Sequence, residues 1–204
     1  DAADDFALVA RGNGVLRDRA RFMGGLVSYR LGDFTTAASQ WDETVRSVAD
    51  ADIASAAQYG RVWCAIRHQS WRGAAQELDR LTRAYPASQE AATAARLRDT
   101  LRDADGLPMR SPRAAKWLST ALPGVGQVYA GRVGSGVVSL GLNAGFFYFL
   151  ARAAADRRWV DAAFIYVAGG RFYWGGRQNA EKFTLARNAR VREDFVARLA
   201  VYEF

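Results

Sequence analysis

Apolar residues in the first half of the chain recur at spacings of three and four, and the pattern returns after 37 residues. A helix needs this spacing to present one apolar face. The pattern therefore predicts two copies of a helix, a short break and a second helix. The first copy carries Phe22, Leu26, Tyr29, Phe34, Ala37, Ala38, Trp41 and Asp42, and the second carries Tyr59, Trp63, Ile66, Trp71, Ala74, Ala75, Leu78 and Asp79.

Flanking helices complete this half of the prediction. Residues 88–104 place Leu97 and Leu101 on one face before an Asp- and Gly-rich break. We expect this helix to cap the repeats, and a helix from about Phe6 to Leu16 to pack on their other end. The predicted repeat domain covers residues 1–105, folds by itself, and is followed by a linker at 106–110.

In the second half, apolar residues form long runs. Ser111 and Pro112 suit the start of a helix, and the run Val133–Ala151 has no charged side chain. At about 1.5 Å per residue this run would be roughly 28 Å long as a helix, close to the hydrocarbon thickness of a bilayer. We therefore expect residues 111–179 to form an apolar helical hairpin region associated with a membrane. A buried core helix of a soluble domain is the alternative.

Glycine, polar and aromatic residues within this region are candidates for specific roles. Gly141 and Gly145 form a Gly-x-x-x-Gly pair, which favours close contact with another helix. Asn143 and Arg171 are candidate polar groups inside the membrane. A further apolar stretch either packs against the preceding helix or lies at the lipid interface, where the candidate aromatic residues are Trp159, Tyr173 and Trp174.

The segment 123–132 predicts a structural pivot. A proline and two glycines must end or bend the preceding helix. We expect the Gln127 amide to pair with backbone groups freed at the break, and Tyr129 and Arg132 to reach water at the end of the hairpin. The residues of this motif are Pro123, Gly124, Gly126, Gln127, Tyr129, Gly131 and Arg132.

Residues 180–204 predict a basic amphipathic helix. Phe195 and Leu199 share its apolar face with Val191 and Tyr202, while arginines occupy other positions. Such a helix suits a partner protein or a lipid surface.

Composition narrows the chemistry. The net charge is +7, and almost all of the basic residues are arginine. The arginines are spread along the chain, and no nucleic-acid recognition motif is present. Cys64 is the only cysteine, so an intramolecular disulfide and a cysteine-rich zinc site are excluded. Cys64 and His68 lie four residues apart without a third catalytic group, which favours packing over catalysis. We expect no catalytic residue, cofactor, metal or nucleic-acid partner.

Two segments support a family resemblance. Residues 29–37, Tyr-Arg-Leu-Gly-Asp-Phe-Thr-Thr-Ala, resemble the tetratricopeptide pattern, and the second copy ends in Ala84-Tyr85-Pro86. The motif at 122–132, together with Asn143 and residues 173–176, resembles the C-terminal region of bacterial envelope tetratricopeptide proteins. The resemblance implies periplasmic repeats and a membrane-associated second half, and it brings no assigned activity.

These observations predict an all-α protein with a short tetratricopeptide-like repeat array and an apolar helical hairpin region. Its predicted function is that of a non-enzymatic adaptor or scaffold in the bacterial envelope, with the repeats binding a protein and the second half in or on the membrane. One alternative is a structural subunit whose apolar half is covered by the partner chains of a larger membrane complex. A third is an enzyme or lipid-handling protein that uses Gln127, Asn143 and Arg171.

Overall fold

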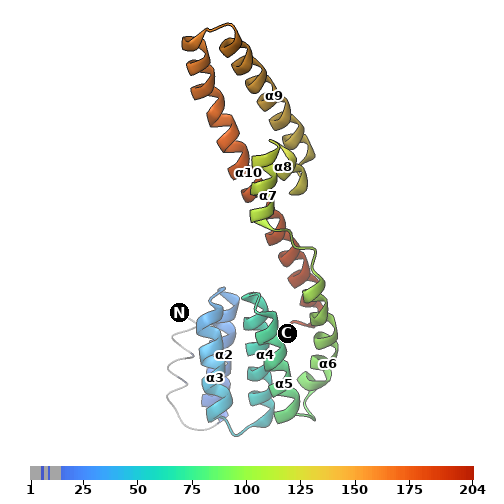
Figure 1. Ribbon diagram of the computed structural model, residues 1–204. Coiled ribbons are helices and arrows are strands. Elements are labelled where there is room, and N and C mark those ends of the chain that lie inside the picture. Colours follow the sequence, from blue (N-terminus) through green and yellow to red (C-terminus); the bar gives the residue numbers. More distant parts are fainter. Residues whose placement is uncertain (1–5, 7–8, 10–14) are drawn as a thin grey trace. The chain divides into compact units, whose positions relative to one another are not determined.

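The computed structural model describes residue 6, residue 9 and residues 15–204 (Figure 1). Every regular element in this part of the chain is helical, which confirms the all-α prediction. Two compact units divide the chain: unit 1 extends to Leu107 and includes Asp194–Phe204, and unit 2 is Pro108–Glu193. Most of the helix predicted between Phe6 and Leu16 lies outside the described residues.

Unit 1 is a series of antiparallel helices whose boundaries follow the sequence pattern. They are α2 (Val15–Arg30), α3 (Phe34–Ser47), α4 (Ala51–Arg67), α5 (Trp71–Ala84), α6 (Gln89–Leu101) and the short 3₁₀ helix η1 (Arg102–Gly106). Helices α3 and α5 begin 37 residues apart and end 37 residues apart. Asp33, Asp50 and Ser88 cap the N-termini of α3, α4 and α6 by accepting hydrogen bonds from backbone N–H groups.

Trp41 is central to the packing of the first three of these helices. Its side chain is completely buried, and its indole Nε1 donates to the Phe22 carbonyl at 3.1 Å. The ring lies against Gly25 of α2 and Gly60 of α4, where a Cβ atom would overlap it. Two glycines therefore create the space that this large side chain fills.

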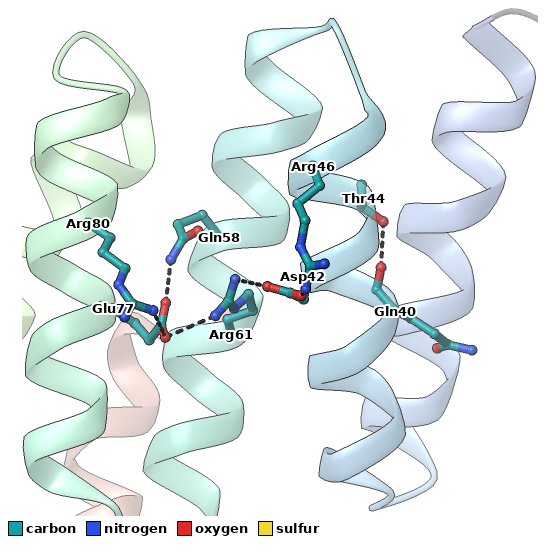
Figure 2. Close-up of polar contacts among 8 residues, drawn as sticks. All are labelled: Gln40, Asp42, Thr44, Arg46, Gln58, Arg61, Glu77 and Arg80. Carbon is teal, nitrogen blue, oxygen red and sulfur yellow. Dashed lines mark hydrogen bonds and ion pairs between the residues drawn. The ribbon is translucent and has the colours of Figure 1, made fainter.

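A polar network joins neighbouring helices of unit 1 (Figure 2). Arg61 of α4 pairs with Asp42 of α3 and, through Nη2 at 3.1 Å, with Oε1 of Glu77 of α5. The ion pair of Asp79 and Arg98 joins α5 to α6, each partner 37 residues after its counterpart in the Asp42–Arg61 pair. Partly exposed pairs contribute little to stability, so their main effect is to fix how adjacent helices align.

The structure corrects the prediction of a separate helix at 180–204. Helix α10 is continuous from Trp159 to Leu199, with no break near residue 180, and the 3₁₀ helix η2 (Ala200–Tyr202) follows it. Phe195 and Leu199 are completely buried in the core of unit 1, where the Phe195 ring meets Trp71 edge to face at a centroid distance of 5.2 Å. The apolar face predicted for a partner or a lipid surface is thus covered by the chain's own helices.

Unit 2 contains α7 (Pro112–Ala121), α8 (Val125–Tyr129), α9 (Val133–Ala155) and α10 up to Glu193. Helices α9 and α10 form an antiparallel hairpin (Figure 1). The Phe146 ring lies directly against Gly169, so the second apolar stretch packs on the first. Among the described helices, α9 alone is long and apolar enough to cross a membrane, and only 17% of its apolar window is buried.

Candidate functional site

The segment from Pro123 to Arg132 connects α7, α8 and α9. Gly124 has φ +95°, a left-handed conformation that favours glycine. A Cβ atom on Gly126 would overlap the Ala115 carbonyl oxygen, so α8 packs closely on α7. Several freed backbone groups pair with other backbone groups, including Val125 N with Leu122 O at 3.2 Å and Arg132 N with Gln127 O at 2.8 Å. The Gln127 amide nitrogen instead lies near Gly176 O of α10. The expectation that the Gln127 amide pairs with the break is therefore wrong.

Tyr129 and Arg132 have different surroundings. The Tyr129 hydroxyl accepts a hydrogen bond from Ser111 N at 3.1 Å, and the Arg110 guanidinium lies over the ring at 5.4 Å. Tyr129 thus ties the motif to the start of α7. Arg132 is exposed, with its guanidinium 5.2 Å from the centre of the Phe183 ring. Gly131 has φ +87° and open space around its Cβ position, as expected for a turn residue.

Three polar residues singled out in the sequence come together in unit 2. Gln127, Asn143 and Arg171 line one groove of about 430 Å³ on α8, α9 and α10, together with Ser139 and Asn179. Sequence reasoning did not assign Ser139 or Asn179 to a site, because only the antiparallel packing of α9 and α10 brings them to the same groove. We call this the polar groove.

Two amides in the polar groove are incompletely paired. Gln127 and Asn143 are almost completely buried. Gln127 Nε2 lies 3.4 Å from Gly176 O, and Asn143 Nδ2 donates to Ser139 O at 2.7 Å. Their side-chain oxygens have no hydrogen-bond partner among the described residues. A buried acceptor without a donor costs about 1–3 kcal/mol, so both unpaired oxygens destabilise this arrangement.

An apolar groove of about 470 Å³ adjoins the polar one and shares Leu142 and Phe172 with it. Gly141 and Gly145 line it, and no neighbouring atom lies within 4 Å of either Cβ position. No described residue makes the close helix contact expected at this glycine pair. The pair instead leaves space along the hairpin.

The candidate interface aromatic residues do not form one group. Trp159 and Trp174 are exposed, and the Arg177 guanidinium lies 4.7 Å from the centre of the Trp174 ring. Tyr173 is half-buried, and its hydroxyl donates to Thr120 O of α7 at 2.9 Å. Tyr173 therefore joins two helices of unit 2, whereas the two tryptophans are available to their surroundings.

Unit 1 contains a second polar site that the sequence pattern did not reveal. Arg67 Nη2 donates to the two carboxylate oxygens of Glu203 at 2.6 and 2.8 Å, and Arg67 Nε donates to the Tyr29 hydroxyl at 2.9 Å. The Tyr29 hydroxyl in turn donates to Glu203. Burial, followed by the hydrogen bond to Glu203, raises the pKa of Tyr29. The three residues are far apart in sequence, so no local motif could have identified the site.

Aromatic residues surround this polar group. The Phe204 ring centre lies 5.7 Å from that of Tyr29, 5.8 Å from that of Trp41 and 6.0 Å from that of Tyr59. The Tyr59 hydroxyl donates to the Tyr202 carbonyl at 2.5 Å. Side chains from α2, α3 and α4 thus converge on residues 202–204.

The Cys64 and His68 pair shows no catalytic arrangement. Cys64 is buried, and burial raises the pKa of its thiol to about 12, so the reactive thiolate is scarce at neutral pH. His68 Nε2 lies 3.5 Å from the Thr35 hydroxyl, and its ring packs edge to face on Phe34. The described part of the chain contains no group of three side chains suited to a metal ion.

Comparisons with family models, curated proteins and solved structures gave no match to this chain.

Proposed function

We propose that the protein is a membrane-anchored, non-enzymatic adaptor, in which unit 2 associates with the lipid bilayer and unit 1 binds a partner protein. The observation that carries the proposal is the exposed apolar surface of the hairpin formed by α9 and the first half of α10. Val137 and Phe164 have exposed fractions of 62% and 72%, and their apolar neighbours are similarly exposed.

Such a surface is costly in water. Burying apolar surface contributes about 25 cal/mol per Å², and soluble monomers rarely expose contiguous apolar patches larger than a few hundred Å². The hairpin also carries exposed Trp159 and Trp174, which suit a membrane interface. A lipid environment would cover all of this surface without any change in the helical backbone.

The adaptor part of the proposal depends on unit 1. We interpret its helices as a short tetratricopeptide-like array, supported by the 37-residue offset between α3 and α5. The equivalent ion pairs Asp42–Arg61 and Asp79–Arg98 and the buried Ala37 and Ala74 follow the same offset. Arrays of this kind commonly bind proteins. The resemblance of residues 122–132 to bacterial envelope proteins favours that envelope, with unit 1 in the periplasm.

Flotation with liposomes tests the anchoring. The full chain should float with phosphatidylglycerol and phosphatidylethanolamine vesicles and resist extraction by alkaline carbonate. Val137→Arg combined with Phe164→Arg should lower the floated fraction severalfold, since an arginine costs about 2.5–3.5 kcal/mol at the centre of a membrane helix and less toward its ends, where these two positions lie. Leu31→Arg, at a position in unit 1 that is 76% exposed, is the matched control and should float normally.

Release of the unmodified chain by carbonate would contradict membrane insertion. If the chain then remained soluble only with other chains from its native membrane, the alternative of a structural subunit in a larger membrane complex would replace the anchor.

The polar groove supports lipid handling as a second candidate function. Arg171 can pair with a lipid phosphate, in a groove whose lining also includes the polar side chains of Ser139 and Asn179. The adjoining apolar groove has room for an acyl chain. Native mass spectrometry should find anionic lipid retained by the full chain, less by Arg171→Gln, and as much by Arg157→Gln. Equal retention by both variants would exclude the groove as a headgroup site.

A further inference from the structure

We propose that Tyr29, Trp41, Tyr59 and Arg67 form a recognition site for a partner segment in which an aromatic residue directly follows a glutamate, and that residues 202–204 of the chain occupy this site in competition with the partner. We call it the Arg67 site. The proposal rests on the adaptor function above and names the chemistry of its partner.

Two parts of the segment 194–204 are held differently. Phe195 and Leu199 have no exposed surface and belong to the core cluster of unit 1. Phe204 is 46% exposed, and neither Glu203 nor Phe204 belongs to that cluster. The earlier residues are structural core, whereas residues 203 and 204 lie on the surface of that core as a bound peptide would.

Residues 202–204 use contacts that any extended peptide can offer. Glu203 has φ −71° and ψ 157°, so the chain has left the helix at this point. The site binds one backbone carbonyl, through the Tyr59 hydroxyl, one carboxylate, through Arg67 and Tyr29, and one aromatic ring. A segment of another protein could make all three contacts without forming a helix.

The Arg67 site is selective for the side chains that it binds. The Glu203 carboxylate accepts from Arg67 and Tyr29, both of which act as donors here. A glutamine would keep the shape but lose the charge and turn its NH₂ group toward these donors. Partly buried ion pairs provide little net stability but strongly penalise a mismatched partner. The aromatic faces of Tyr29, Trp41 and Tyr59 then select for a ring at the next position.

Tethering makes the site self-regulating. A segment joined by a short connection has an effective concentration on the order of millimolar. A free partner must displace residues 202–204 from the site. The site therefore responds only to a partner that binds tightly or is locally concentrated.

Peptide binding to the full chain in detergent micelles tests the proposal. The probe is a fluorescent peptide Ala-Val-Tyr-Glu-Phe with blocked ends, measured by fluorescence anisotropy. Glu203→Gln should bind it about tenfold more tightly than the unmodified chain, because the competing segment is weakened. Phe204→Ala removes a half-exposed ring and should give a similar gain. Glu181→Gln disrupts an exposed ion pair with Lys116 in unit 2 and should give none.

Two further measurements make the outcome decisive. A probe with glutamine in place of glutamate should bind Glu203→Gln about tenfold more weakly than the original probe. Adding Arg67→Gln to Glu203→Gln should abolish this difference between the probes. If neither Glu203→Gln nor Phe204→Ala gains affinity, or if both probes bind equally, the Arg67 site is not a recognition site. Normal flotation in that case would leave the membrane anchor intact.

Discussion

At the residue scale, glycines in unit 1 differ in what lies beside them. Gly25 faces the Trp41 indole, whereas Gly24, its neighbour on α2, has only the end of the Gln40 side chain at 4.0 Å. Both are in the same helix, so their backbone propensities are equal and only their surroundings differ. The sequence pattern identified Trp41 as a core residue but could not show that glycines on two other helices accommodate it, because that contact depends on tertiary packing.

This contrast predicts opposite effects for two adjacent substitutions. Gly24→Ala should stabilise unit 1 by about 0.5–1 kcal/mol, since alanine favours a helix over glycine. Gly25→Ala should destabilise it by about 1–3 kcal/mol, because the new methyl group overpacks the core against Trp41. Urea unfolding of the two full-length variants, monitored by circular dichroism, measures both changes. Equal stability of the two would contradict the close contact between α2 and Trp41.

At the element scale, the sequence predicted the positions of helices more successfully than the length of α10 or the packing between helices. The spacing of apolar residues predicted the positions of α3 and α5, and Ser111-Pro112 marked the start of α7. The sequence did not reveal that α10 continues through residue 180, because no local signal distinguishes a continuous helix from two adjacent ones there. The sequence also did not show that Ser139 and Asn179 line the polar groove.

The 123–132 motif gives a prediction at this scale. Gly126→Ala should disrupt the packing of α8 on α7, because its methyl group would overlap the Ala115 carbonyl oxygen. We expect a loss of about 1–3 kcal/mol in the stability of unit 2. Gly134→Ala is the control, since nothing lies within 4 Å of its Cβ position. Limited proteolysis of the detergent-solubilised chain should show faster cleavage near residues 122–132 in the first variant alone. Equal cleavage would mean that this connection is a tolerant loop.

At the scale of the whole molecule, the division of the chain into units does not follow its linear order. The sequence predicted a domain boundary near residue 105, close to Leu107, where the first part of unit 1 ends. It also predicted that the apolar face of residues 180–204 meets a partner protein or a lipid surface. Periodicity shows that Phe195 and Leu199 share a helix face and cannot show which surface covers that face. The return of residues 194–204 to unit 1 is a long-range contact, and it also places residues 202–204 in the Arg67 site.

This return changes what is expected of an isolated fragment that ends before unit 2. Phe195 and Leu199 are completely buried in unit 1, and burying one such side chain contributes about 1.5–3 kcal/mol. A fragment of residues 1–107 should therefore lose roughly 3–6 kcal/mol, a large share of the roughly 5–15 kcal/mol that stabilises a typical domain. We expect weak, poorly cooperative unfolding of this fragment in urea instead of the independent folding that the repeats alone suggest.

A peptide spanning residues 194–204 should restore cooperative unfolding when added to the fragment, because it returns the missing core side chains without the rest of α10. The same peptide with alanine in place of Phe195 and Leu199 keeps Glu203 and Phe204, and it should fail to restore stability. The two peptides thus separate the core contribution of the segment from the contacts at the Arg67 site. A fragment that unfolds cooperatively by itself, and gains nothing from either peptide, would show that these two residues cover a domain that is already complete.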